Sequence, residues 1–207
     1  LSKKQLDISV LLILSIGAGC GLVYEYLLSH YAARVLGTVE EAIYAIISVM
    51  MVFMGIGSFL ARWIKNPFSG FAWLEVMLAL IGSSSVLIIG GLFALSVLFP
   101  RLLMETFGLP PDLMPVGGIF ATAKAMAQIS PYLIAALLGM LIGMEIPLIA
   151  DIRKTIYQDK LEHNIGSIYG IDYIGAGIGA ILWVFFMLSM EVSLAAALTA
   201  SANLFIG

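Results

Sequence analysis

The chain has 207 residues, of which 61% are hydrophobic and only 11% are charged. Since an ordinary soluble domain has about 25% charged residues, this composition excludes a soluble globular protein. It predicts an all-α protein, a polytopic helical bundle whose first partner is the lipid bilayer. The net charge of -3 comes without any basic stripe, so we expect no nucleic-acid partner.

Apolar segments recur along the whole chain. A membrane-spanning helix needs about 20 predominantly apolar residues, and this rule predicts about six spans in a single transmembrane domain over residues 1–207. The spans are expected at about 8–29, 42–61, 71–98, 132–150, 166–190 and 192–206. The first is too long for a signal peptide and lacks its cleavage pattern, so we interpret it as a retained span.

The stretch from 100 to 130 separates the third and fourth predicted spans. Pro100 is expected to end the third span, and the four prolines in 100–118 predict an interfacial loop. The helix-prone segment 121–130 fits either a surface or re-entrant helix, or the outer turns of a long fourth helix kinked at Pro131. We favour the long helix.

The distribution of basic residues predicts the topology. With a cytoplasmic N-terminus and six spans, the cytoplasmic side has seven basic residues: Lys3, Lys4, Arg62, Lys65, Arg153, Lys154 and Lys160. The opposite side has three: Arg34, Arg101 and Lys124. Because cytoplasmic loops carry an excess of Lys and Arg, both termini are expected in the cytoplasm.

Glycines recur at four-residue spacing within the apolar segments. Such spacing lets two helix backbones approach closely, and packing within one chain is favoured over a homodimer interface. The glycines concerned are Gly17, Gly21, Gly139, Gly143, Gly166, Gly170, Gly175 and Gly179. Two sets of three spans would also allow a 3+3 inverted repeat, as in many transporters, although the sequence echoes between the halves are weak.

Three carboxylates lie inside apolar segments, namely Glu25, Glu145 and Asp172. Charged residues at such depth are expensive and usually mark a functional or pairing site. Together with the nearby Tyr24, Tyr169 and Tyr173, they predict a binding site for an amine or another cation, because carboxylates and aromatic rings both attract cations. Alternatively, each acid is protonated, pairs with a neighbour and only fixes helix register.

No catalytic residue and no metal site is predicted, because the chain lacks a phosphate-binding loop, a His/Cys metal spacing and a nucleophile–base–acid set. The single cysteine, Cys20, allows no intrachain disulfide. The sequence therefore offers no self-contained active site.

Four segments, taken in order, resemble the N-terminal membrane domain of the membrane-integrated spermidine synthases, which are prokaryotic polyamine aminopropyltransferases. They are GLVYEYLLSHYAARVLGT at 21–38, MGIGSFLAR at 54–62, GMEIPLIADI at 143–152 and IGSIYGIDYIGAGIGAILW at 165–183. No matching motif occurs between about 100 and 130.

The resemblance implies a multi-pass domain of the prokaryotic inner membrane. In that family a soluble Rossmann-like domain uses decarboxylated S-adenosylmethionine as co-substrate to convert putrescine to spermidine. That catalytic domain is expected after residue 207 as a partner, and the missing initiator methionine and the end at Gly207 favour a cut fragment. Whether this chain is itself part of an enzyme stays open.

Two functions are therefore expected from the sequence. The first is a membrane domain that anchors an aminopropyltransferase and binds or passes polyamines such as putrescine and spermidine. The alternative is an independent secondary transporter or exporter of small cations or amines. A Rossmann-like domain encoded after Gly207 would favour the first function.

Overall fold

A computed structural model describes residues 3–108, 110, 117–157 and 161–207, and within these ranges it contains helices and no strand. The all-α prediction is confirmed for this part of the chain. The main helices are α1 (Lys3–Leu36), α2 (Val39–Leu60), α3 (Pro67–Phe93), α4 (Phe99–Phe107), α5 (Ile119–Tyr157), α6 (Leu161–Phe185) and α7 (Val192–Ile206).

Five helical segments are long enough and apolar enough to cross a membrane: Lys3–Leu36, Val39–Trp63, Pro67–Phe107, Ile119–Ile156 and Ile165–Ser189. Helix α7 is apolar but has only 15 residues. The number of spans that cross a bilayer stays a prediction.

Several helices extend beyond the predicted spans. Helix α1 continues to Leu36, so only Gly37 and Thr38 connect it to α2. Gly37 has a φ of 75°, a left-handed conformation that glycine adopts without strain. Helix α3 begins at Pro67, where the side-chain oxygen of Asn66 accepts hydrogen bonds from the backbone of Phe68 and Ser69 at 3.2 and 3.3 Å.

The prediction that Pro100 ends the third helix is wrong. Helix α3 continues through a π-helical turn, Ala94–Leu98, directly into α4. Pro100 lies in the first turn of α4, where proline's fixed φ is compatible with a helix. Residues 100–107 are therefore helical, and of the predicted loop 100–118 only residues 108, 110, 117 and 118 are described without helix.

Residues 121–130 belong to α5, which continues through both Pro131 and Pro147. The long fourth helix is thus the arrangement found, and the surface and re-entrant alternatives are wrong. Each proline frees a carbonyl four residues earlier. The Ser130 hydroxyl donates to the carbonyl of Ala127 at 3.5 Å, and the Ser58 hydroxyl of α2 donates to that of Gly143 at 2.8 Å.

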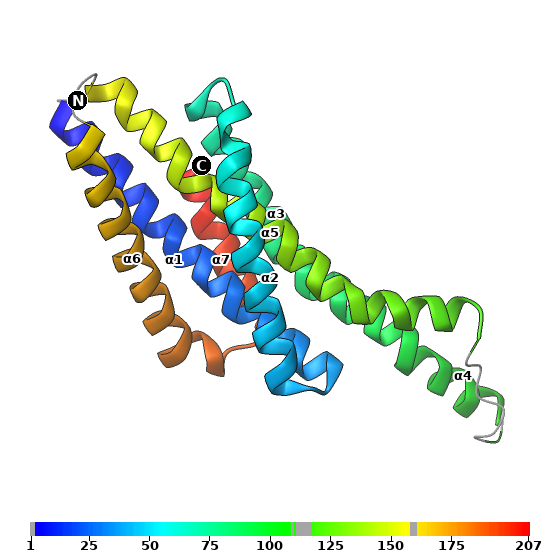
Figure 1. The fold of residues 1–207 in the computed structure, drawn as a ribbon. Coiled ribbons are helices and arrows are strands. Elements are labelled where there is room, and N and C mark those ends of the chain that lie inside the picture. Colours follow the sequence, from blue (N-terminus) through cyan, green and yellow to red (C-terminus); the bar gives the residue numbers. More distant parts are fainter. Residues whose placement is uncertain (1–2, 109, 111–116, 158–160) are drawn as a thin grey trace.

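Figure 1 shows a bundle with an arm. Helix α4 and the beginning of α5 extend away from the other helices, and the rings of Phe99 and Phe120 pack against each other there with centroids 6.2 Å apart. Both labelled chain ends, the start of α6 and the end of α2 lie at the opposite end of the molecule.

Two pairs of parallel helices make the most extensive contacts, α2 with α5 and α1 with α6. In the first pair, Cβ atoms at Gly139 and Gly143 would overlap the backbones of Met50 and Met54. In the second pair, Cβ atoms at Gly175 and Gly179 would overlap those of Ser15 and Gly19. Both pairs therefore depend on glycine for their close approach.

The remaining predicted packing glycines differ. Gly21 contacts the side chain of Ile142, and Gly17 faces two carboxyl groups. Gly166 and Gly170 face open space, because a Cβ atom added at either residue would have no atom of another helix within 4 Å. These two glycines do not pack against another helix within the described chain.

We expect Gly143→Ala to destabilise the protein by about 1–3 kcal/mol, because the added methyl group overlaps the Met54 carbonyl and must push α2 and α5 apart. Gly170→Ala is the matched control, and it should be neutral or stabilising by about 0.5–1 kcal/mol, since the site is open and alanine favours the helix. Thermal unfolding in detergent measures both. Equal effects of the two substitutions would contradict the packing described for α2 and α5.

Candidate functional site

Two carboxyl groups face each other in the centre of the bundle. Glu75 of α3 is 0% exposed and Glu145 of α5 is 1% exposed. A Cβ atom at Gly17 of α1 would lie 3.2 Å from Oε2 of Glu145 and 3.3 Å from Oε1 of Glu75. The two oxygens are therefore no farther apart than the sum of these distances, and only the missing side chain of Gly17 leaves space between them.

The register of α1 against α3 places Glu75 at this position. Along α1, positions 17, 24 and 31 meet positions 75, 82 and 90 of α3 in order, so the two helices are parallel. The ring of Tyr24 lies over Gly82 and the hydroxyl of Tyr31 approaches Gly90, and neither glycine has a side chain to block them. This repeat of about seven residues keeps one face of α1 against α3 and directs Gly17 to Glu75.

Helix α7 closes the site on a further side. Cδ1 of Ile206 is 3.6 Å from the same Cβ position at Gly17, and a Cβ atom at Gly207 would lie 2.7 Å from Cβ of Glu75. Asn203 lies one turn before these residues on α7 and is 0% exposed. We call Gly17, Glu75, Glu145 and Asn203 the carboxyl site.

Several polar atoms around the carboxyl site have no hydrogen-bond partner within the described residues. They are both carboxyl oxygens of Glu75, Oε1 of Glu145, the hydroxyl of Tyr24 and both side-chain amide atoms of Asn203. A buried charge without a partner costs far more than a buried neutral group. The two carboxyl groups can therefore be charged together only with a compensating cation, and no group of three or more His, Cys, Asp and Glu side chains surrounds such an ion in the described chain.

The predicted site residues do not form one cluster. Glu145 and Tyr24 lie in the interior, and Asp172 is half-buried but near enough to Glu145 for their charges to interact. Tyr169 and Tyr173 of α6 are 46% and 73% exposed and point away from the core.

Glu25 is half-buried and lies far from Asp172 along the bundle. Because Gly175 and Gly179 of α6 meet Ser15 and Gly19 of α1, Asp172 lies at the level of about residue 12 of α1. Glu25 is therefore about 20 Å away along the axis, at a helical rise of about 1.5 Å per residue.

Glu75 and Asn203 are not among the site residues predicted from the sequence. A signal for Glu75 was available, because it is the one charged residue in the predicted span 71–98, and intramembrane acids usually mark a functional site. No sequence signal separates Asn203 from other polar residues, since its importance depends on how α7 packs.

An ion pair ties three helices together at the end of the bundle near the N-terminus. Arg153 of α5 donates to Asp7 of α1 through Nε at 2.6 Å and through Nη2 at 3.1 Å. Its Nη1 donates to the hydroxyl of Ser167 on α6 at 2.6 Å. Arg153 is 6% exposed, so this network holds α1, α5 and α6 in a fixed arrangement.

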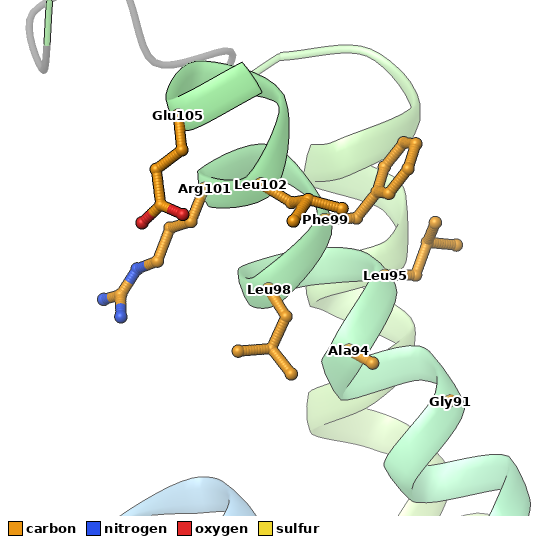
Figure 2. Close-up of a pocket in the computed structure, with 8 residues that line it drawn as sticks. All are labelled: Gly91, Ala94, Leu95, Leu98, Phe99, Arg101, Leu102 and Glu105. Atoms are coloured by element: carbon orange, nitrogen blue, oxygen red, sulfur yellow. The ribbon is translucent and has the colours of Figure 1, made fainter. Parts of the chain in front are cut away.

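A second hollow lies on the arm and has different chemistry. It has a volume of about 690 Å³ and is lined by Gly91, Ala94, Leu95, Leu98, Phe99, Arg101, Leu102 and Glu105. Figure 2 shows Arg101 and Glu105 extending from the same side of α4, while Phe99 points to the other side. This hollow is open and mainly apolar, and it shares no residue with the carboxyl site.

The chain is similar to proteins named polyamine aminopropyltransferase. It is 52% identical over 201 residues to one from Shewanella oneidensis, covering 97% of this chain and 35% of that protein. It is 31% identical over 180 residues to polyamine aminopropyltransferase 1 of Streptomyces coelicolor, covering 86% of this chain and 29% of that protein. A relative from Leptospira interrogans is 30% identical over 185 residues, with 89% and 30% covered.

The chain thus spans about a third of the length of the curated relatives it matches. These matches support a spermidine synthase-like family. No protein-family model and no solved structure matches the chain.

We expect Asp7→Asn to lower the free energy of unfolding by about 1.5–3 kcal/mol, because it removes the charged acceptor of two hydrogen bonds from a buried arginine. Asp151→Asn, which changes an exposed acid on α5, is the control and should change stability by less than about 0.5 kcal/mol. Chemical or thermal unfolding in detergent compares the two. If Asp7→Asn unfolds like the control, the ion pair does not hold these helices together.

Proposed function

We propose that this chain is the membrane domain of a spermidine synthase-like aminopropyltransferase and anchors the catalytic part of that protein at the inner membrane. The supporting observation is that nearly the whole chain matches about a third of proteins named polyamine aminopropyltransferase, while this third is made of long apolar helices. A soluble enzyme has no use for five helices of this kind. The reaction, its co-substrate decarboxylated S-adenosylmethionine and the soluble catalytic partner belong to the proposal.

The proposed orientation places both termini in the cytoplasm. Lys3, Lys4, Arg62, Lys65, Arg153 and Lys154 belong to helix ends and connections at one end of the bundle, and Arg34, Arg101 and Lys124 to those at the other. An excess of basic residues marks the cytoplasmic side. A cytoplasmic C-terminus would deliver a following domain to cytosolic putrescine.

Polyamine binding is the finer part of the proposal. Polyamines are polycations, and half-buried carboxylates offer them charge-assisted hydrogen bonds. Asp172 and Glu25 are half-buried and can be reached from outside, whereas Glu145 is enclosed. Asp172, with Tyr169 and Tyr173 one turn or less away on α6, is the stronger candidate, because exposed tyrosine rings add cation–π contacts.

A second candidate function is a secondary transporter of small cations built as a 3+3 inverted repeat. The contacts of the structure favour it in one respect. If α1, α2 and α3 correspond to α5, α6 and α7, the pair α1–α6 corresponds to α5–α2, and these are the two most extensive pairings in the bundle. Transporters place their sites at such repeat interfaces.

The test uses the full-length protein that carries this sequence, expressed in a bacterial strain without its own spermidine synthase. We expect aminopropyl transfer from decarboxylated S-adenosylmethionine to putrescine in the membrane fraction, resistant to carbonate washing. Removing residues 1–207 should release any remaining activity into the soluble fraction. A protein that shows no aminopropyl transfer, or that is soluble when intact, would contradict the proposal.

Polyamine binding is measured separately by calorimetric titration of putrescine and spermidine into the same protein with its catalytic site blocked by a tight substrate analogue. We expect saturable binding that Asp172→Asn weakens and that Asp151→Asn, which changes an exposed acid on α5, leaves unchanged. Glu145→Gln should also leave it unchanged, because this carboxyl group is enclosed. Absence of binding would reduce the domain to an anchor.

A further inference from the structure

The space in front of Gly17 is bounded by two carboxyl groups and is sealed from outside. Oxygens of Glu75 and Glu145 lie 3.3 and 3.2 Å from the position that a Cβ atom of Gly17 would take. The exposures of 0% and 1% mean that bulk water does not screen these groups. The space is therefore sized for a single small atom or ion between two acidic groups.

Neutral polar groups around this space also lack partners. Asn203 is 0% exposed and neither atom of its amide is hydrogen-bonded within the described residues. It lies on the face of α7 that also carries Ile206 and Gly207, and these two approach Gly17 and Glu75. Two carboxyl groups alone would be no more than an acidic cluster. A buried amide without a partner, on the face of α7 that packs against Gly17 and Glu75, is a second observation, and it indicates a missing ligand.

Tyr24 provides a further unpartnered oxygen. Its ring packs over Gly82, seven residues after Glu75 on α3, and its hydroxyl is buried without a partner among the described residues. Side chains of a helix lean toward its N-terminus, which for α1 is the direction of Gly17. The unpartnered oxygens are thus two from Glu75 and one each from Glu145, Tyr24 and Asn203. That of Glu145 is Oε1, while Oε2 of the same carboxyl group borders the space at Gly17.

We propose that the carboxyl site binds one Na⁺ ion, with Glu75 and Glu145, which share one proton, as its carboxyl ligands and the oxygens of Asn203 and Tyr24 as neutral ones. The buried ion pair described above, Arg153 with Asp7, involves neither acid. A cation from outside therefore supplies one positive charge, and the two carboxyl groups keep one proton between them, so that no net charge stays buried.

The size of the space and the number of ligands favour Na⁺ over Mg²⁺, Ca²⁺ and polyamines. Mg²⁺ usually keeps several of its waters, and Ca²⁺ takes 6–8 oxygens at about 2.3–2.6 Å, whereas the site is enclosed and has five unpartnered oxygens among the described residues. A polyamine has a chain of methylene groups that a space bounded by Gly17, Glu75, Glu145 and Ile206 cannot hold.

Protons compete with the ion for the same oxygens. The titratable groups near the pair are Cys20 and Tyr24 of α1 and Asp172 of α6. Of these only Asp172 is an acid, and it is half-buried. Na⁺ should therefore bind more weakly as the pH falls and the carboxyl groups take up protons.

The Na⁺ site goes beyond the proposed function. An anchoring domain can lack it, and a Na⁺ site can exist in a protein that binds no polyamine, so the two proposals fail separately. The site departs from the expectation that the chain contains no metal ligand.

The test is equilibrium binding of radioactive Na⁺ to the full-length protein, purified in detergent in a choline buffer without Na⁺. We expect one saturable site per chain. Glu75→Gln and Glu145→Gln should each lose it, and Glu105→Gln, which changes an exposed acid of the arm, should retain it. Lowering the pH should weaken binding to the wild-type protein, and unlabelled K⁺ or putrescine should compete poorly.

Gly17→Ala is a second variant that keeps both carboxyl groups. Its methyl group occupies the space between them, so Na⁺ binding should weaken although no ligand is removed. This variant decides the matter if a glutamine variant fails to fold. The proposal is overturned if the wild-type protein shows no saturable Na⁺ binding, if Ca²⁺ displaces Na⁺ at equal concentration, or if Gly17→Ala binds like wild type.

Discussion

The close approach of α1 to its neighbours is the constraint on which the rest of the structure depends. Helix α1 contacts α3, α5, α6 and α7, and it can do so because it carries glycine where the other helices come nearest. At Gly19 this allows backbone contact with α6, and at Gly17 it leaves space for two carboxyl groups from α3 and α5. The same absence of side chains thus explains both the packing and the buried acids, since a larger residue at position 17 would displace Glu75 and Glu145.

Composition and periodicity were sufficient to predict a helical protein with long apolar segments, because these properties are local. The helix ends were harder to predict. Proline ends a helix where its missing N–H group would otherwise have been hydrogen-bonded. Pro100 lies in the first turn of α4, directly after the π-helical turn, and the N–H groups of a first helical turn have no partner within their helix. Helix α5 continues through Pro131 and Pro147, and the carbonyl that each proline frees accepts a hydrogen bond from a serine hydroxyl. Ser58 belongs to another helix, so no local pattern could have indicated that pairing.

The candidate site shows the same division between local and non-local information. Glu145 stands out in the sequence as an acid in an apolar segment, and by the same rule Glu75 could have been selected. That these two face each other, and that Glu25 lies at a different level, depends on the register of α1 against α3, α5 and α6. Tyr24, Tyr169 and Tyr173 look equivalent in the sequence, yet the first is buried and the other two are exposed. This difference in burial depends on how α1 and α6 pack against the other helices, which the sequence does not show.

A membrane anchor alone does not explain the interior of this bundle. Two enclosed carboxyl groups and a buried amide without a partner in the described chain are destabilising relative to apolar residues of similar size. A bundle that only had to hold another domain at a membrane would be more stable without them. In an inverted repeat α3 corresponds to α7, so Glu75 and Asn203 would occupy related helices while only one of them carries a charge. Such an asymmetric, costly arrangement at the meeting point of four helices is typical of an ion site in a transport protein. The proposed Na⁺ site accounts for this cost, because a bound cation would offset negative charge that apolar surroundings leave unscreened.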